Sequence, residues 1–289
     1  MEFIWPMLLN AAEPFSSNKY IYQWKADGIR LELLYKRGKG VTCYTRHGTN
    51  CTLQFVELQE FQAAADIILD GELICMDQEI GRESLDLVME RFHLKKEDKI
   101  KYAALYKPCV YVVFDILYYN EPLLHLDLLD RLSILNSSFE DSPHIQKMTY
   151  IDGEGDDFFE NVKNLKLEGM VAKLKENSPY LPGKRTSNFL KVIRYEYFDN
   201  IVITGYRKKK FGLLCSFITS DGSYRAAGVI EFIGPEPRKK IFKKILNSKV
   251  GEDRLNVYVK KEIVCKVKTR GLTKHGYLRT PVFIEFASL

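Results

Sequence analysis

The sequence predicts an α+β fold in two domains, a larger domain over residues 1–196 and a small β-barrel over residues 197–289. The chain has 289 residues, 46% of them hydrophobic, which is enough for two separate cores. Several short segments alternate apolar and polar residues with the period of a β-strand. Residues 1–196 carry 24 Lys and Arg against 30 Asp and Glu, whereas residues 197–289 carry 19 against 8. The basic excess predicts a polyanion partner for the second domain, the alternative being a merely solubilising surface.

The segment Lys25-Ala26-Asp27-Gly28-Ile29-Arg30 lies between predicted strands at 20–24 and 31–35. A lysine amine with a lowered pKa can attack the α-phosphorus of a nucleoside triphosphate and retain AMP as a phosphoramidate. Burial and nearby cations such as Lys191 would lower the pKa of Lys25 in this way. The alternative is a charged surface hairpin turn, in which Gly28 supplies a positive φ.

Four further segments combine a predicted buried strand with acids or lysines. They are Asp70-Gly71-Glu72, 110–115, 167–173 and 189–194. We expect their charged residues to lie at strand ends and to converge on one crevice, as a phosphoryl-transfer site with a divalent metal requires.

In this order and spacing, the segments resemble the nucleotidyltransferase motifs of ATP-dependent DNA ligases and of the related mRNA capping enzymes. The run from Met89-Glu90-Arg91 through Lys107-Pro108-Cys109 to Phe114-Asp115-Ile116-Leu117 is most similar to compact bacterial and phage ligases and to the ligase module of bacterial end-joining enzymes. The resemblance covers nearly the whole chain. It implies an ATP-grasp-like nucleotidyltransferase domain of antiparallel sheets flanked by helices, with ATP as substrate and Mg²⁺ or Mn²⁺ as cofactor.

The resemblance also assigns roles in the nucleotide site. Lys25 is implied as the catalytic nucleophile, Glu72 as the acceptor for the ribose hydroxyl with Asp70 and Gly71 shaping its turn, and Phe114 as the ring that stacks on adenine. The alternative for Phe114, from the sequence pattern alone, is a residue of the hydrophobic core. The alternative for the D-G-E segment is an ordinary hairpin turn. The remaining implied nucleotide ligands are Arg30, Lys173 and Lys191, and the implied metal ligands are Glu168 and Glu72.

The resemblance implies DNA contacts at Asp27 and Arg46, with an Asp27–Arg30 salt bridge as the alternative for the first. The basic excess of residues 197–289 separately predicts DNA contacts at its most concentrated cations, Lys208, Lys209 and Lys210. Arg279, in the segment 278–283, resembles the start of the family's final motif and is expected to orient the pyrophosphate leaving group. Two departures stand out. Ile193 occupies the place of a second lysine in the motif of Lys191, and the chain ends at Leu289 before the basic and acidic residues that usually complete the final motif.

The second domain is predicted to be an OB-fold. Runs at 201–206, 213–218, 227–232 and 263–267 interleave aromatic and β-branched residues, which is typical of short barrel strands. A five-stranded OB-fold fits this number, with residues 237–247 as its helix.

The six cysteines are scattered and contain no C-x-x-C pair, so we expect reduced core thiols rather than a zinc module or a disulfide framework. No apolar run approaches the roughly 20 residues that span a bilayer, and the first residues lack the features of a signal peptide, which predicts a cytoplasmic protein without a membrane partner.

Together these features predict an ATP-dependent DNA ligase that seals nicks in duplex DNA as a monomer, with a Ku-like end-binding protein left open as a partner. The alternatives are an RNA ligase, a GTP-dependent capping-type enzyme, or a nucleic-acid-binding scaffold without catalysis. A buried lysine ringed by carboxylates argues against the scaffold, because binding alone has no use for it.

Overall fold

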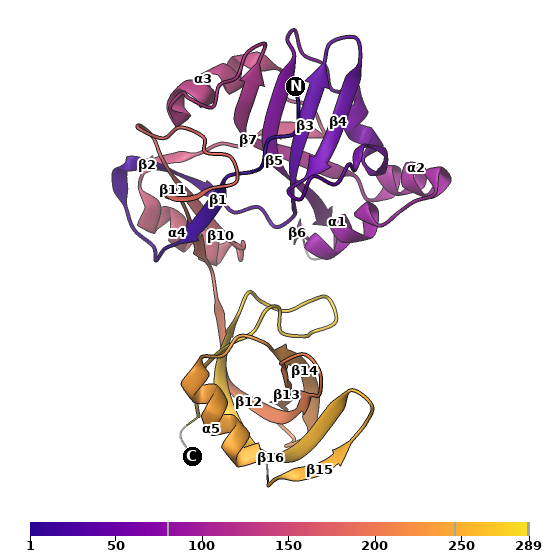
Figure 1. Cartoon of the computed structure of the whole chain (residues 1–289), viewed down its shortest axis with the longest axis vertical. Helices are drawn as coiled ribbons and strands as arrows, with labels where there is room; N and C mark the ends of the chain where they lie inside the picture. Colours follow the sequence, from indigo (N-terminus) through magenta and orange to yellow (C-terminus); the bar gives the residue numbers. More distant parts are fainter. Residues whose placement is uncertain (80, 246, 288–289) are drawn as a thin grey trace. The chain divides into compact units, whose positions relative to one another are not determined.

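The computed structural model describes residues 1–79, 81–245 and 247–287. Its contacts divide the chain into two compact units, Met1–Ile193 and Arg194–Leu289. Each unit has its own buried core. Figure 1 colours the chain along its sequence, from indigo at the start of the N-terminal unit to yellow at the end of the C-terminal unit.

The first sheet of the N-terminal unit has five strands in the order β1-β11-β10-β2-β9. Their bounds are Leu8–Ala11 (β1), Ser17–Trp24 (β2), Ile151–Gly153 (β9), Gly169–Leu174 (β10) and Arg185–Ile193 (β11). The pairs β2–β10 and β10–β11 are antiparallel, whereas β1 runs parallel to β11. The sheet therefore joins strands from both ends of the unit.

The second sheet of this unit follows the order β4-β3-β5-β7-β8, with β6 paired to β5. The strands are Ile29–Lys36 (β3), Gly40–Thr45 (β4), Ile67–Asp77 (β5), Arg82–Glu83 (β6), Cys109–Tyr119 (β7) and Ile145–Lys147 (β8). Most of β5 and β7 is buried on both faces, which explains why their sequences are nearly continuous apolar runs.

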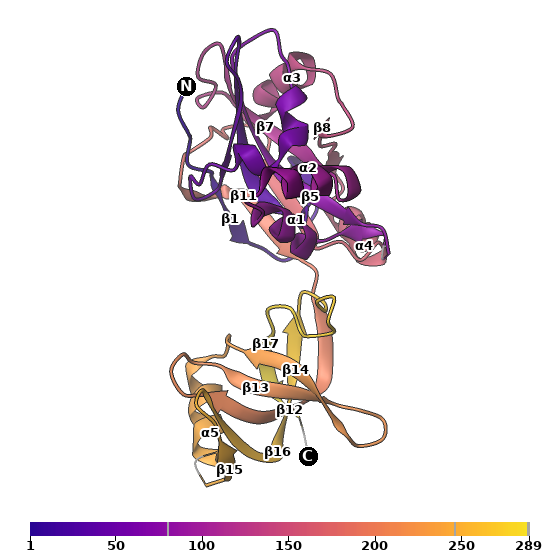
Figure 2. The ribbon, with the colours of Figure 1, turned by 90° about the vertical axis from the view of Figure 1, so that its right-hand side faces the viewer.

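Four α-helices and two short 3₁₀-helices flank these sheets (Figure 2). They are α1 (Leu85–Phe92), α2 (Glu97–Tyr106), α3 (Leu128–Ser138), α4 (Gly155–Asn164), η1 (Thr52–Gln54) and η2 (Val56–Glu60). The Ser84 side chain caps α1 by accepting a hydrogen bond from the Leu87 N–H. Helix α3 packs against β7 and contributes Leu128, Leu132 and Leu135 to the main core.

The C-terminal unit is one curled, mainly antiparallel sheet of six strands with a single helix. Its elements are β12 (Glu196–Arg207), β13 (Leu213–Ile218), β14 (Tyr224–Ile230), α5 (Pro235–Ile245), β15 (Lys249–Glu252), β16 (Asn256–Thr269) and β17 (Val282–Phe286). Beyond the end of β14, Phe232 forms a parallel bridge with Val282 of β17, which curls the two sides of the sheet toward each other.

Three details differ from the sequence predictions. The D-G-E segment is not a turn but the middle of β5, and Gly71 is required there because a Cβ would lie 2.5 Å from the Tyr111 ring. The C-terminal sheet has six strands rather than five, because the short, largely exposed β15 has no apolar pattern to reveal it. The helix begins at Pro235 rather than at residue 237, and position 246 of its predicted end lies outside the described residues.

All six cysteines are buried free thiols, in agreement with the sequence analysis. Among the described residues, none of the helices combines the length and the apolar character that crossing a bilayer requires.

Candidate active site

A pocket of about 450 Å³, including space open to solvent, lies in the N-terminal unit. Residues of both sheets line it. They are Leu9, Gln23, Trp24, Lys25, Ala26, Arg30, Glu72, Phe114, Met148, Val171, Lys173 and Phe189. Loop 25–28 joins β2 of the first sheet to β3 of the second, so the predicted nucleophile sits where the chain crosses between the sheets.

The register of the first sheet places the pocket residues on one face. Gln23 of β2 pairs with Val171 of β10, and Phe189 of β11 pairs with Lys173. Lys191 pairs with Val171, and directly opposed residues of antiparallel strands project to the same side. Lys191 therefore belongs to the pocket face of the sheet, although it does not line the pocket itself.

The second sheet contributes Arg30, Glu72 and Phe114. Arg30 of β3 pairs with Glu72 of β5, so both side chains project from one face. Phe114 lies on β7 beside a bulge and is half-buried, whereas the strand residues on either side of it are buried. Most of these residues lie inside strands rather than at strand ends, which corrects the expected placement. The loop residues Lys25 and Ala26 line the pocket beside these strand residues.

Lys25 is held at both its backbone and its side chain. Its N–H donates to the carbonyl of Gly169, and its Nζ lies 2.5 Å from Oε2 of Glu168. The Lys25 side chain is 22% exposed, whereas that of Glu168 is 4% exposed. The ion pair that the structure gives Lys25 is thus with a buried carboxylate.

Gly28 allows the loop to pass close to the second sheet. A Cβ at this position would lie 2.0 Å from the carbonyl oxygen of Leu73 in β5. Its role is this close approach and not a positive φ, because Gly28 is not among the residues with left-handed backbone. The hairpin-turn alternative is excluded, since the flanking strands belong to different sheets.

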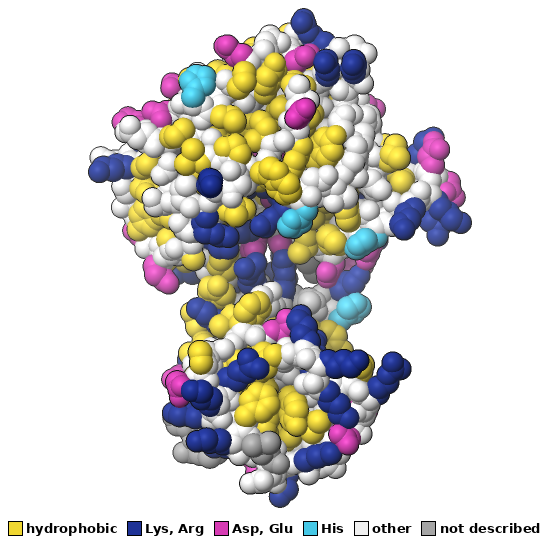
Figure 3. All heavy atoms as spheres, in the orientation of Figure 1, with side chains coloured by type: hydrophobic (Ala, Val, Ile, Leu, Met, Phe, Trp, Pro, Cys, Tyr) yellow, Lys and Arg dark blue, Asp and Glu magenta, His cyan; other side chains and the backbone are white. Residues whose placement is uncertain are grey.

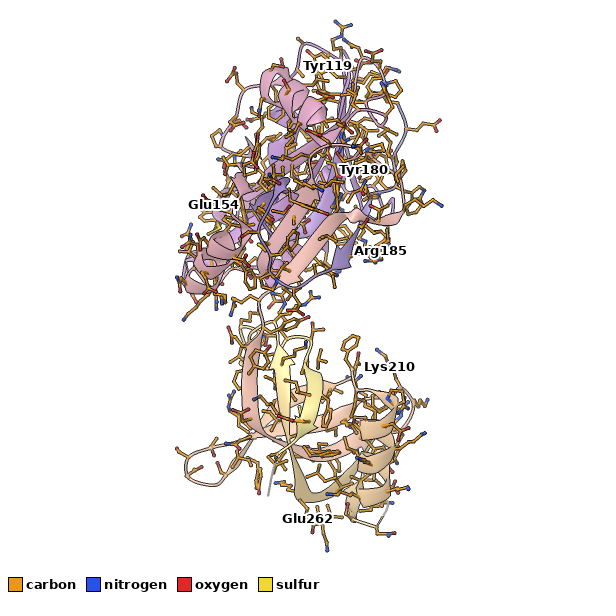
Figure 4. All side chains as sticks on the ribbon, turned by 90° about the vertical axis from the view of Figure 1, so that its left-hand side faces the viewer. Tyr119, Glu154, Tyr180, Arg185, Lys210 and Glu262 are labelled. Atoms are coloured by element: carbon orange, nitrogen blue, oxygen red, sulfur yellow. The ribbon has the colours of Figure 1, made fainter. Side chains whose placement is uncertain are left out.

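Arg30 is fixed by Asp70 rather than by Asp27. Its guanidinium donates to both carboxylate oxygens of Asp70, at 2.7 and 2.5 Å, and the hydroxyl of buried Tyr180 donates to Asp70 at 2.8 Å. Figure 4 labels Tyr180 in the N-terminal unit. Burial opposes the charge of Arg30, but the neighbouring Asp70 outweighs it and raises the Arg30 pKa. The Arg30 Cζ lies 4.8 Å from the centroid of the Phe114 ring, within range of a cation–π contact.

Lys173 is a buried amine in the pocket wall. Its Nζ donates to the carbonyl of Phe114 at 3.0 Å and lies 4.3 Å from the centroid of the Phe114 ring. Burial lowers the pKa of Lys173 to about 7, although Asp115 opposes this shift. A lysine in this state gains a full charge when an anion enters the pocket.

Glu72 lines the pocket, whereas Glu168 is not part of the lining and reaches the site through its ion pair with Lys25. Burial raises the pKa of Glu72 to about 7, against the opposing effect of Lys25, and the charge of Glu168 adds to the rise. Among the described residues, no group of three or more His, Cys, Asp or Glu side chains is arranged to hold a metal.

The other predicted site residues lie outside the pocket lining. Asp27 lies in the loop after Lys25, and its N–H donates to Glu83. Arg46 is exposed in the turn after β4. In the C-terminal unit, Lys208, Lys209 and Lys210 form an exposed loop after β12, and Arg279 lies shortly before β17.

Sequence reasoning missed Gln23 and Tyr180. Gln23 is 1% exposed and lines the pocket, and neither atom of its amide has a hydrogen-bond partner. Its position two residues before Lys25 on an alternating strand was the available signal, because such residues share a face. Tyr180 lies outside every motif, so no local pattern pointed to it.

Comparison with known proteins identifies the family. The family model described as "ATP dependent DNA ligase domain" matches residues 6–192, which include the whole pocket. The SPbeta prophage-derived DNA ligase-like protein LigB of Bacillus subtilis is 38% identical over 283 residues, covering 97% of this chain and 98% of the relative. The chain belongs to the ATP-dependent DNA ligases.

Other ligases match over the full chain. The bifunctional non-homologous end joining protein LigD of B. subtilis is 27% identical over 99% of this chain, which spans only 49% of that relative. Among solved structures, the mycobacterial DNA ligase D complexed with ATP and MES has a TM-score of 0.59 at 22% identity, with 99% of this chain and 96% of that chain covered. A Lig E DNA ligase has a TM-score of 0.62 at 18% identity, with 96% and 98% covered.

These matches confirm the predicted fold class. This ligase has an α+β nucleotidyltransferase domain and a curled antiparallel sheet consistent with an OB-fold. Membership of the DNA ligase family also decides against the RNA-ligase, capping-enzyme and scaffold alternatives.

Proposed function

We propose that this ligase seals nicks in duplex DNA through an AMP adduct on Lys25. In the first of three steps the Lys25 amine attacks the α-phosphorus of ATP and pyrophosphate leaves. AMP then passes to the 5′-phosphate of the nick, and the 3′-hydroxyl finally displaces AMP to join the strand. The observation that carries the proposal is the position of Lys25. It lines the same pocket as Arg30, Phe114 and Lys173, and its Nζ lies 2.5 Å from Oε2 of Glu168.

The charges of the pocket suit this chemistry. Nζ of Lys25 must be without its proton to attack, and Glu168 is within hydrogen-bond distance of it. Arg30 and Lys173 place positive charge along the pocket, which would stabilise the triphosphate and the departing pyrophosphate. Half-buried Phe114 offers an aromatic surface to the base, and the unpartnered Gln23 amide can both accept from and donate to a base edge.

We propose Glu168 and Glu72 as ligands of Mg²⁺ or Mn²⁺. Mg²⁺ takes one or two protein carboxylates together with phosphate oxygens and water, which fits a pair of carboxylates beside a triphosphate site. The bound ion would neutralise charge on the phosphates. It would also draw Glu168 away from Lys25 by competing for the carboxylate.

For the domains, we propose that residues 1–196 carry adenylyl transfer and that residues 197–289 bind DNA. The C-terminal unit presents many Lys and Arg side chains on the face visible in Figure 3, in line with its basic excess. A monomeric state, a cytoplasmic location and a Ku-like partner stay predictions.

The deciding experiment is adduct formation by Lys25→Ala. We expect no labelled protein when this variant is incubated with α-labelled ATP and Mg²⁺, because Lys173, the other amine of the pocket lining, is held by the carbonyl of Phe114 rather than beside Glu168. Lys19→Ala is the matched control, since Lys19 is an exposed lysine of the same strand β2.

Nicked duplexes of DNA and of RNA, offered to the labelled wild-type protein, then test the substrate. We expect joining of the DNA nick only. Normal labelling of Lys25→Ala would remove the assignment of the nucleophile.

A further inference from the structure

Glu83 bridges the two sides of the loop that carries Lys25. Its Oε1 accepts a hydrogen bond from the indole Nε1 of Trp24 at 3.0 Å, and its Oε2 accepts one from the backbone N–H of Asp27 at 2.7 Å. Trp24 immediately precedes Lys25, and Asp27 follows it by two residues. One carboxylate therefore spans the nucleophile without touching it.

The position of Glu83 is itself fixed by the second sheet. It lies on β6 and pairs with Met76 of β5, the strand that also carries Glu72. The next residue, Ser84, donates its N–H to the carbonyl of Cys75 and caps helix α1. Glu83 thus ties the loop to the strand that forms the acidic wall of the pocket.

Without such a tie, loop 25–28 would be weakly defined. It has no regular secondary structure, and it crosses from one sheet to the other. Its backbone is held at Lys25 by the carbonyl of Gly169 and at Asp27 by Glu83. The first anchor belongs to the first sheet and the second anchor to the second sheet, so together they fix the path of the loop across the pocket.

The environment of Glu83 fits a positioning task. Its side chain is half-buried, and burial raises the pKa of Glu83 against the opposing hydrogen bonds from Asp27 and Trp24. Partial burial of a carboxylate costs folding free energy unless both of its oxygens accept hydrogen bonds. Glu83 does not line the pocket, so it is not placed to contact ATP.

We propose that Glu83 is a positioning residue that holds the Lys25 loop in the geometry for in-line attack on ATP. The proposal rests on the proposed role of Lys25. In this role Glu83 does not contact ATP. Both of its carboxylate oxygens are needed, one for the Trp24 indole and one for the Asp27 N–H. Misplacement of a reacting group by about 1 Å can cost about 100-fold in rate, so loss of one anchor should be visible in the chemical step.

The test separates the chemical step from binding. Single-turnover formation of the Lys25 adduct is measured against ATP concentration for Glu83→Ala, Glu83→Gln and the control Glu79→Ala, an exposed acid of the same hairpin. We expect Glu83→Ala to lower the maximal rate by about 100-fold while ATP affinity changes less than about twofold. Glu83→Gln should fall between, because the amide NH₂ that replaces one carboxylate oxygen is a donor and cannot accept the hydrogen bond made at that position.

Fluorescence supplies a second measurement that does not depend on activity. The chain has two tryptophans, Trp5 and Trp24, so a Trp5→Phe background leaves Trp24 as the only indole. In this background Glu83→Ala should change the Trp24 emission maximum and intensity, because the indole N–H loses its acceptor, whereas Glu79→Ala should leave both unchanged.

Wild-type rates in Glu83→Ala, or a loss that appears only as weaker ATP affinity, would overturn the positioning role. If the wild-type protein forms no Lys25 adduct at all, the proposed function fails first, and the fluorescence change alone would then report a structural contact.

Discussion

At the scale of single residues, we expect Lys173 to couple proton binding to nucleotide binding. Its amine is buried beside the Phe114 ring, and burial lowers its pKa to about 7. An entering triphosphate stabilises the ammonium form, so the pKa of Lys173 must rise when ATP binds. At pH 8 the amine is mostly neutral before binding and charged afterwards.

We therefore expect net proton uptake on ATP binding at pH 8, where free phosphates are fully ionised, and a decline of this uptake below pH 7 as Lys173 becomes protonated beforehand. Titration calorimetry in two buffers of different ionisation enthalpy measures the proton count. Lys173→Met, which keeps the chain length without the amine, should abolish the uptake. Equal uptake in the variant would mean that another group titrates.

Substitution of Phe114 can show whether its ring mainly packs in the hydrophobic core or stacks on the adenine base of ATP. We expect both Phe114→Ala and Phe114→Leu to weaken ATP affinity, by about 10-fold or more, because stacking on an aromatic face is lost. Phe114→Leu should nevertheless keep a nearly wild-type melting temperature, since it preserves most of the apolar volume. Unchanged affinity with a large loss of melting temperature in Phe114→Ala would instead identify a core residue.

At the scale of elements, the sequence was sufficient to predict most strands but not the partners of their charged residues. The alternation at 20–24 and 31–35 located β2 and β3, because a local period reflects local burial. The pairing of Arg30 with Asp70, by contrast, depends on the register between β3 and β5. Register describes which residues of two strands lie opposite each other, and the apolar–polar pattern of one strand does not determine it.

The same reasoning explains Glu83 and Gly71. Glu83 acts through β6, a strand of two residues that is too short to show a period. In D-G-E, the glycine serves contact with the Tyr111 ring, although glycine next to acids is also the signal of a turn. A local sequence pattern thus does not predict the role of a residue when that role depends on contacts with distant segments.

The segment before β17 yields a prediction for Arg279. Its carbonyl accepts hydrogen bonds from the N–H of Arg270 and the hydroxyl of Thr269, and its own N–H donates to Gly271. We expect Arg279→Ala to slow adduct formation from ATP far more than it slows sealing of a nick that already carries the 5′-adenylate, because only the first reaction releases pyrophosphate. Equal loss of both activities, measured in parallel gel assays, would point to a structural role or a DNA contact.

At the scale of the whole molecule, charge predicts how the ligase binds DNA. The basic excess lies in residues 197–289, and Lys208 to Lys210 are its most concentrated group. Lys208 pairs with Glu252 and Lys210 with Glu231, but these exposed ion pairs are weak and DNA phosphates can replace them.

The triple variant Lys208→Glu, Lys209→Glu, Lys210→Glu should weaken binding to duplexes of any sequence alike and flatten the dependence of affinity on salt, because fewer counterions are released. Charge reversal at Lys36, Arg37 and Lys39, exposed cations of the β3–β4 hairpin, is the matched control and should have a smaller effect. Fluorescence anisotropy over a range of salt concentrations measures both properties. Salt-insensitive binding by the wild-type protein would contradict the proposed role of the C-terminal domain.

The strand order of the first sheet also affects when the ligase becomes competent during its synthesis. Strand β2, which leads into Lys25, pairs with β10, and β10 in turn pairs with β11, which ends at Ile193. A nascent chain on the ribosome thus presents Lys25 early but lacks the strands that support it until residues up to Ile193 have been made. Such distant pairings also form slowly, because the intervening loop must close first. If Lys25 is the nucleophile, we expect chains that end before Ile193 not to be adenylylated, because the pocket is unfinished until the last strand of the domain has been made.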